Sequence, residues 1–217
     1  MTGATRIIAI RHGETAWNVA TRLQGHLDIG LNAHGEWQAQ RAAQALADEE
    51  IAAIYTSDLS RARATAQAIA DRASHAAARE VHVHTGLRER GFGVFEGQTY
   101  AQIANVWPEE SRRWRQRDPH FAPHGGESLS QVRDRVARTV DTLASQHVGT
   151  QIVLVAHGGV MDALYRLATR QEIESPRTWE LGNAAINRLL WTPDGLSLVG
   201  WSDTRHLDDA VLDETST

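Results

Sequence analysis

The sequence predicts an α/β fold: a three-layer sandwich with a mostly parallel central sheet, helices on both faces and an antiparallel edge near the C-terminus. Short apolar segments typical of strands alternate along the chain with longer segments that have helical periodicity. The segments 7–10 and 151–156 are strongly apolar, as strands covered on both faces of a parallel sheet are. Near the C-terminus, Pro193-Asp194-Gly195 separates two strand-like runs, which indicates a hairpin.

The N-terminal part alternates between the two kinds of segment. Its expected elements are a strand at 7–10, a helix at 32–50, a strand at 53–56, a helix at 59–72 and a short strand at 81–84. Trp37, Ala42 and Leu46 are among the apolar positions of the first helix. The second helix is rich in alanine, the best helix former. The last strand alternates apolar and polar residues.

The C-terminal part continues this order. Its expected elements are a helix at 99–118 broken at Pro108, a helix at 128–146, a strand at 151–156, a helix at 159–168 and hairpin strands at 185–191 and 196–201. Residues 94–126 are too polar to form a core of their own, so we interpret them as a lid-like helical excursion from the sheet. A chain of 217 residues fits one domain, here predicted to cover 1–217.

The composition excludes several classes of function. The formal net charge of -5 predicts no nucleic-acid partner and no attraction to an anionic membrane. No apolar run approaches the length of a membrane span, and no secretory signal is recognisable at the N-terminus. Cysteine is absent, which excludes disulfides, thiol catalysis and thiolate metal sites and fits a cytoplasmic protein. Lysine is absent as well, so an anion must be bound by arginine, histidine or backbone N–H groups.

Chemistry-bearing residues follow several strands at the point where each strand ends. Arg11 and His12 follow the strand at 7–10, and His157 follows the strand at 151–156; a glycine comes directly after each histidine. Arg61 lies in the first turn of the helix that follows the strand at 53–56, and Glu89 follows the strand at 81–84. Because ligands bind at the carboxyl ends of parallel strands, we expect these side chains to meet at one rim. A single such residue is more often structural; the repeated His-Gly pair is the stronger signal.

Other polar patterns have simpler explanations. His82 and His84 alternate on one strand face, but no third ligand stands at a recognisable spacing, so we predict no metal site. The remaining histidines, His206 among them, form no ligand pattern. The run of arginines over 112–117 is interpreted as a solvated helix face, with a lid that favours anionic substrates as the functional alternative.

Seven segments in order resemble the histidine phosphatase superfamily, in its phosphoglycerate-mutase-like, broad phosphatase branch. They are RHGETAWN (11–18), RLQGHLDIGLNAHG (22–35), YTSDLSRARATA (55–66), LRERGFGVFEGQTY (87–100), GGES (125–128), VAHGGV (155–160) and GWSDTRHL (200–207). RHG alone is a weak motif, but the ordered set is specific and spans nearly the whole chain.

The resemblance implies a role for each matching residue. His12 would be the nucleophile that takes the phosphoryl group, and Glu89 the proton donor. The phosphate pocket would be formed by Arg11, Arg61 and His157. Additional contacts to phosphate or substrate would come from Asn18, Gln24 and Gly158.

The implied function is hydrolysis of a phosphomonoester through a phosphohistidine intermediate, on a small phosphorylated metabolite. Two planar arginines supply bidentate donors for the phosphate oxygens and disfavour protonation of His12, so we expect neither metal nor cofactor. Cofactor-dependent phosphoglycerate mutase is one alternative; a phosphoprotein phosphatase or a binding module of the same superfamily is another. The segment after Glu89 is similar to the broad phosphatases, which favours hydrolysis. The oligomeric state stays open, with a homodimer as one option.

Overall fold

The computed structural model describes residues 3–208, and its centre is a six-stranded sheet in the order β3-β2-β4-β1-β5-β6. The strands are β1 (Thr5–Arg11), β2 (Ala53–Thr56), β3 (Val81–Val83), β4 (Gln151–Ala156), β5 (Ile186–Thr192) and β6 (Gly195–Asp203). The first four run parallel, while β5 pairs antiparallel with both β1 and β6. The predicted mostly parallel sheet with an antiparallel C-terminal edge is confirmed.

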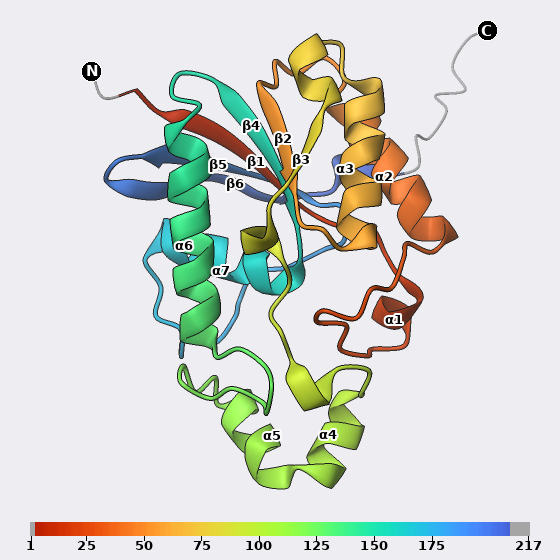
Figure 1. The fold of residues 1–217 in the computed structure, drawn as a ribbon, viewed down its shortest axis with the longest axis vertical. Helices are drawn as coiled ribbons and strands as arrows, with labels where there is room; N and C mark the ends of the chain where they lie inside the picture. The colour runs from red at the N-terminus through yellow and green to blue at the C-terminus, as the bar shows by residue number, and fades with distance from the viewer. Residues whose placement is uncertain (1–2, 209–217) are drawn as a thin grey trace, which may run out of the picture.

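Helices cover both faces of this sheet. The helices of the described chain are α1 (Ala16–Val19), α2 (Ala33–Ala45), α3 (Ser60–Arg72), α4 (Tyr100–Val106), α5 (Pro108–Arg115), α6 (Leu129–Ser145) and α7 (Gly158–Thr169), of which α2, α3, α6 and α7 pack on the sheet. Short 3-10 turns lie at Ala76–Arg79, Thr85–Leu87, Gly93–Phe95 and Arg205–Leu207. Figure 1 shows α2 and α3 on one side of the sheet and α6 and α7 on the other. None of the helices within residues 3–208 combines the length and apolarity that a membrane span requires.

The central strands build two cores because successive side chains point to opposite faces. In β1, Ile7 and Ala9 join the cluster that packs under α6 and α7, whereas Ile8 and Ile10 join the cluster under α2 and α3. β4 divides in the same way and all six of its residues are buried. Burial on both faces explains why these two segments are the most apolar of the chain.

The helix ends follow local capping chemistry. Asn32 caps α2 by accepting a hydrogen bond from the backbone N–H of Gly35, and the helix ends at Ala45, five residues before the predicted end. Ser128 and Gln131 form a capping box at the start of α6. The short helix α1 was not predicted; Thr15 and Asn18 form its capping box. Pro108 separates α4 from α5, as its missing N–H requires.

The excursion over residues 94–126 contains α4 and α5 and lies at the lower end of Figure 1. Our expectation that this segment is too polar to form a core is wrong. Five of its side chains form an apolar cluster separate from the cores of the sheet, and Leu23 and Phe92 pack into the same cluster from outside the segment. The five are Phe95, Ile103, Trp107, Trp114 and Phe121. The Phe95 and Trp114 rings stack with centroids 5.2 Å apart. A few large aromatic rings supply much apolar area, which the high content of arginine in this segment conceals.

Candidate active site

The carboxyl ends of β1, β2 and β4 lie at one edge of the sheet. Arg11, the last residue of β1, is in register with Ala156, the last residue of β4, and Thr56 of β2 is in register with Val155. The residues that follow these strands therefore lie side by side. The ring centroids of His12 and His157 are 5.1 Å apart, and both side chains are buried, with 2% and 0% of their surface exposed.

A cleft of about 420 Å³ opens at this edge. Its wall includes these residues that the sequence singled out: Arg11, His12, Asn18, Gln24, Arg61, Glu89 and Gly158. His157 lies next to His12, behind this wall. The structure thus brings the predicted residues together from segments up to 147 positions apart, from Arg11 to Gly158, at one sheet edge.

His12 presents one ring nitrogen to the cleft. Its Nδ1 lies 2.7 Å from the carbonyl oxygen of Gly13, and because a carbonyl only accepts, Nδ1 carries the hydrogen and donates it. Burial, followed by the positive charges of Arg11 and Arg61, holds the pKa of His12 well below its ordinary value. The ring is therefore neutral near pH 7, and Nε2 carries an unshared electron pair.

His157 is hydrogen-bonded through the opposite nitrogen. Its Nε2 lies 2.7 Å from the hydroxyl of Ser57, and that oxygen also accepts from the backbone N–H of Leu59. We assign the hydroxyl hydrogen to Nε2, because no other acceptor for it lies among the described residues; the ring hydrogen is then on Nδ1. Burial, then the neighbouring His12 and arginines, lowers the pKa of His157 well below its ordinary value. Neutral His157 thus has an N–H at Nδ1, which is buried and has no partner among the described residues.

Two arginines leave a similar donor unpaired. Arg61 donates from Nη1 to the carbonyl of Leu27 at 2.9 Å and from Nη2 to that of Gly25 at 2.8 Å. Arg11 donates from Nη1 to the carbonyl of Leu181. The Nε of each is buried without a partner within residues 3–208. Such donors are costly unless a ligand accepts from them, so the arrangement fits an oxyanion.

Glu89 is held with one oxygen fixed. Its Oε1 accepts from the backbone N–H groups of Arg90, at 2.8 Å, and Gly159, at 2.9 Å. The Arg135 guanidinium donates to the carbonyls of Gly86 and Arg88 at 2.9 Å and so fixes the chain leading to Glu89. The other carboxyl oxygen, Oε2, is left to act on a ligand in the cleft.

The amide side chains complete the wall. Asn18 accepts through Oδ1 from the backbone N–H and the hydroxyl of Thr15, which leaves its Nδ2 as a donor. The Oε1 of Gln24 is buried without a partner in the described part of the chain. Asn183 donates to the carbonyl of His12 at 2.8 Å and so holds the backbone of that residue.

Sequence reasoning missed Ser57 and Asn183, which orient the two histidines. Ser57 follows β2 at the same edge, so its position after the strand was a usable signal. Asn183 lies in an irregular segment before β5, where no pattern points to it.

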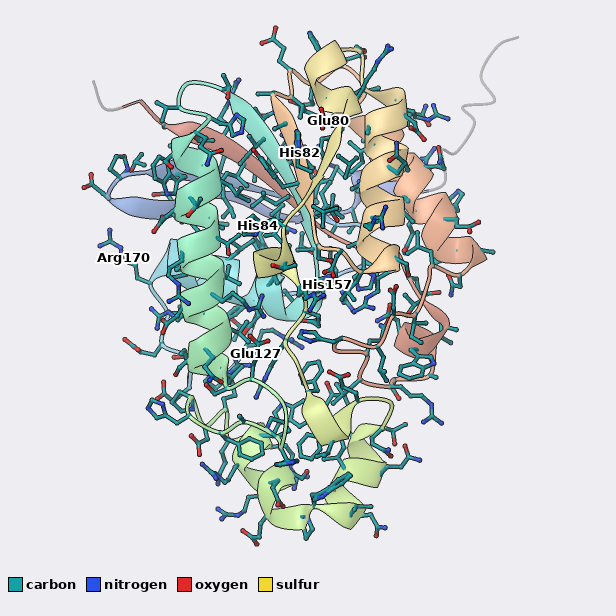
Figure 2. The ribbon with its side chains drawn as sticks, viewed as in Figure 1. Glu80, His82, His84, Glu127, His157 and Arg170 are labelled. Atoms are coloured by element: carbon teal, nitrogen blue, oxygen red, sulfur yellow. The ribbon has the colours of Figure 1, made fainter. Side chains whose placement is uncertain are left out.

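Most of the arginine run is a solvated surface, as the simpler interpretation held. Arg112 pairs with Glu109 and Arg113 with Asp118, while Arg117 alone of the run's arginines lines the cleft. Figure 2 shows Glu80, His82 and His84 following one another just before β3, within it and just after it. No group of three metal-ligating side chains occurs among the described residues. His206 lies 3.1 Å from the Ala184 carbonyl through Nε2, which indicates a structural role.

A comparison with models of known protein families tests the resemblance found in the sequence motifs. The model of the histidine phosphatase superfamily (branch 1) matches residues 7–204. The chain belongs to this superfamily. The resemblance found in its motifs is therefore confirmed, and the chain is a histidine phosphatase by family.

Relatives of this histidine phosphatase include proteins named as mutase-like and proteins named as phosphatases. Phosphoglycerate mutase-like protein 4 from Arabidopsis thaliana is 36% identical over 94% of this chain and 87% of its own length. The metal-independent phosphoserine phosphatase of the same plant is 35% identical over 94% of this chain and 83% of its own. A mycobacterial glucosyl-3-phosphoglycerate phosphatase, solved with VO3, superimposes with a TM-score of 0.81 at 34% identity, covering 92% of this chain and 99% of its own.

Proposed function

We propose that this histidine phosphatase hydrolyses phosphomonoesters of small metabolites through a phosphohistidine on Nε2 of His12. One observation carries the proposal: an unshared electron pair on His12 faces a pocket where the Arg11 Nε, Arg61 Nε and His157 Nδ1 donors are buried and find no partner in the described structure. A phosphoryl group supplies both the electrophile and the acceptor oxygens that this arrangement lacks.

The first half-reaction transfers the phosphoryl group to the enzyme. His12 Nε2 attacks phosphorus while the bond from phosphorus to the ester oxygen breaks. The two arginines and His157 donate to the equatorial oxygens, where negative charge is concentrated in the transition state. The departing alkoxide takes a proton from Oε2 of Glu89 and leaves as the free alcohol.

The second half-reaction regenerates the enzyme. A water molecule attacks the phosphorus of phosphohistidine and gives its proton to Glu89 as the bond to Nε2 breaks. Inorganic phosphate leaves, and His12 is neutral again. Because arginine provides the positive charge throughout, the proposal needs no metal; the name of the plant phosphoserine phosphatase, which is metal-independent, supports it.

The size of the cleft supports a metabolite as substrate. A volume of about 420 Å³ is within the range of small-molecule sites. A phosphoprotein would present a much larger surface, so we place that alternative second. The cytoplasmic location remains a prediction, as does the absence of a nucleic-acid partner, and a homodimer stays open.

Mutase activity is tested directly against hydrolysis. With 3-phosphoglycerate and catalytic 2,3-bisphosphoglycerate, we expect release of inorganic phosphate to be faster than formation of 2-phosphoglycerate. Both products are quantified in the same samples, with phosphate by a colorimetric assay and 2-phosphoglycerate through enolase coupling. Rapid isomerisation with negligible phosphate release would establish the mutase instead, because a mutase must return the phosphoryl group before water attacks.

A further inference from the structure

The cleft carries more positive charge than one phosphate requires. Its wall contains six arginines, Arg11, Arg22, Arg61, Arg90, Arg117 and Arg177, against two carboxylates, Glu89 and Asp162. The chain as a whole has a formal net charge of -5, so this concentration of cations is local to the cleft. A phosphomonoester carries at most two negative charges near neutral pH. The excess points to a second anionic group on the ligand.

Three of these arginines are already committed to the protein. Arg117 donates to Asp162 and to the Ile173 carbonyl, both at 2.7 Å. The guanidinium of Arg90 donates to the carbonyls of Glu127 and Phe121 and lies over the Trp114 ring. Arg22 donates to the carbonyl of Gly97 at 2.7 Å.

The other three arginines of the wall do not all have the same role. Arg11 and Arg61 belong to the proposed phosphate pocket. Arg177 is exposed and has no hydrogen-bond acceptor and no ion pair within residues 3–208, although it lines the cleft. Of the wall's arginines outside the proposed phosphate pocket, Arg177 is therefore the one for which the described residues provide no partner.

The loop that carries Arg177 is fixed on both sides of it. Before Arg177, the Arg166 guanidinium donates to the carbonyls of Glu172 and Ser175. After Arg177, the Trp179 ring stacks on Tyr165 with centroids 4.0 Å apart. Further along, the Leu181 carbonyl accepts from Arg11. A side chain on an anchored loop is positioned at low entropic cost, which suits recognition.

Arg177 also lies close to the phosphate pocket. Burial lowers the pKa of Arg11, the negative charge of Glu89 opposes this, and the positive charge of Arg177 lowers it further. The link from Arg11 to the Leu181 carbonyl joins the pocket and the loop directly. One ligand of metabolite size can therefore reach both.

We propose that Arg177 binds a carboxylate of the substrate and makes this histidine phosphatase selective for phosphorylated carboxylic acids. The proposal rests on the proposed function, since it names the substrate class of the same cleft. A single planar guanidinium matches one carboxylate through two parallel hydrogen bonds. A second phosphate would bring up to two further negative charges, whereas a carboxylate brings the single charge that Arg177 matches.

Binding of a matched pair of ligands tests the proposal without turnover. 3-Phosphoglycerate and glycerol 3-phosphate share the phosphate ester and the neighbouring hydroxyl; only the first has a carboxylate, which a hydroxymethyl group replaces in the second. Each is titrated by calorimetry into the His12→Ala chain, which lacks the proposed nucleophile. We expect 3-phosphoglycerate to bind about tenfold more tightly or better, because a charge-assisted hydrogen-bond pair is present only there.

Variants of Arg177 then test whether this residue causes the preference for the carboxylate ligand. Adding Arg177→Gln is expected to bring the ratio of the two dissociation constants close to one, and Arg177→Lys to retain part of it. Arg170→Gln is the control, because it removes the same charge from a residue just after α7 that does not line the cleft and lies at the margin of the molecule, far from His157 (Figure 2). This control is expected to keep the full ratio. If the His12→Ala chain does not fold, competition against para-nitrophenyl phosphate hydrolysis in the wild-type background measures the same ratio.

Two results would overturn the proposal: equal affinity for both ligands in the parent chain, or a ratio that survives Arg177→Gln. Failure of the proposed function is a separate result, namely that the wild-type chain hydrolyses neither para-nitrophenyl phosphate nor any phosphomonoester. The binding ratio measured by calorimetry does not depend on that assay.

Discussion

His12 and His157 follow neighbouring parallel strands with the same His-Gly sequence, but the two rings have opposite nitrogens available. His12 donates from Nδ1 to the Gly13 carbonyl, so Nε2 keeps its electron pair. His157 contacts Ser57 through Nε2, so Nδ1 keeps its hydrogen. In our proposal one imidazole is therefore a nucleophile and the other a donor to phosphate. The hydrogen-bond partner of a histidine, rather than its motif, determines this difference.

The glycines after the two histidines also differ in what they approach. A Cβ on Gly13 would lie 2.3 Å from the carbonyl oxygen of Gly35, so this glycine lets the first turn of α2 pack against the loop after β1. A Cβ on Gly159 would lie 2.4 Å from Oε1 of Glu89, whereas on Gly158 the nearest atom would be Glu89 Oε2 at 3.6 Å. Gly13, after the first strand, permits close packing of α2 on the loop, whereas Gly159, after the second, leaves room for the carboxylate of Glu89, the proposed acid.

The largest expected effect separates the two histidines. His12→Ala should reduce kcat with para-nitrophenyl phosphate by roughly 10⁴-fold or more, because the covalent path is lost. His157→Ala removes one donor to the transition state, so its loss should be about 10²- to 10³-fold. Phosphoenzyme trapped by rapid quench should be acid-labile in the wild type, reduced in His157→Ala and absent in His12→Ala. Retention of activity within about tenfold in His12→Ala would remove it as the nucleophile.

A smaller effect is expected from the two glycines of the second strand end. Gly159→Ala should displace the Glu89 carboxylate and slow hydrolysis of an alkyl phosphate by about ten- to a hundredfold. Para-nitrophenyl phosphate, whose leaving group needs little protonation, should be affected much less. Gly158→Ala is the matched control and should cost less than Gly159→Ala, since its Cβ meets only ordinary contacts. Equal slowing of both esters in Gly159→Ala would argue against Glu89 as the acid.

The smallest expected effect concerns pH. Burial lowers the pKa of both His12 and His157 in the folded chain, so the unfolded chain binds protons first as the pH falls. The resulting stability is fully present above the unfolded value of about 6.5 and is lost below it, by about 1.4 kcal/mol per pH unit for each histidine. Urea unfolding between pH 7.5 and 5.5 measures the slope.

His157→Gln should flatten that slope by the contribution of one histidine, whereas replacing exposed His34 should leave it unchanged. A slope that His157→Gln does not alter would show that this ring is not held neutral. In activity, the acid limb should lie below pH 6.5, because protonated His12 has no electron pair with which to attack.

Local patterns were enough for most of the secondary structure and for the location of the candidate site. Consecutive apolar residues in β1 and β4 mark strands buried on both faces, and Pro108 marks the break between α4 and α5. Parallel strands carry the residues that follow them to the same edge, so Arg11, His12 and His157 could be placed together from order along the chain alone. Local patterns did not indicate the apolar cluster of the excursion, whose aromatic rings are separated by charged residues.

The sequence by itself determined the fold class, the family and the residues that meet at the sheet edge, because each depends on periodicity or on ordered motifs. Only the tertiary structure decided what each side chain can do there. The partners that orient it come from distant segments: Ser57 for His157, Asn183 for the backbone of His12, and the anchored loop for Arg177. Hydrogen bonds and close approaches act over about 3 Å in space, and no regularity along the chain encodes which distant residues come within that distance.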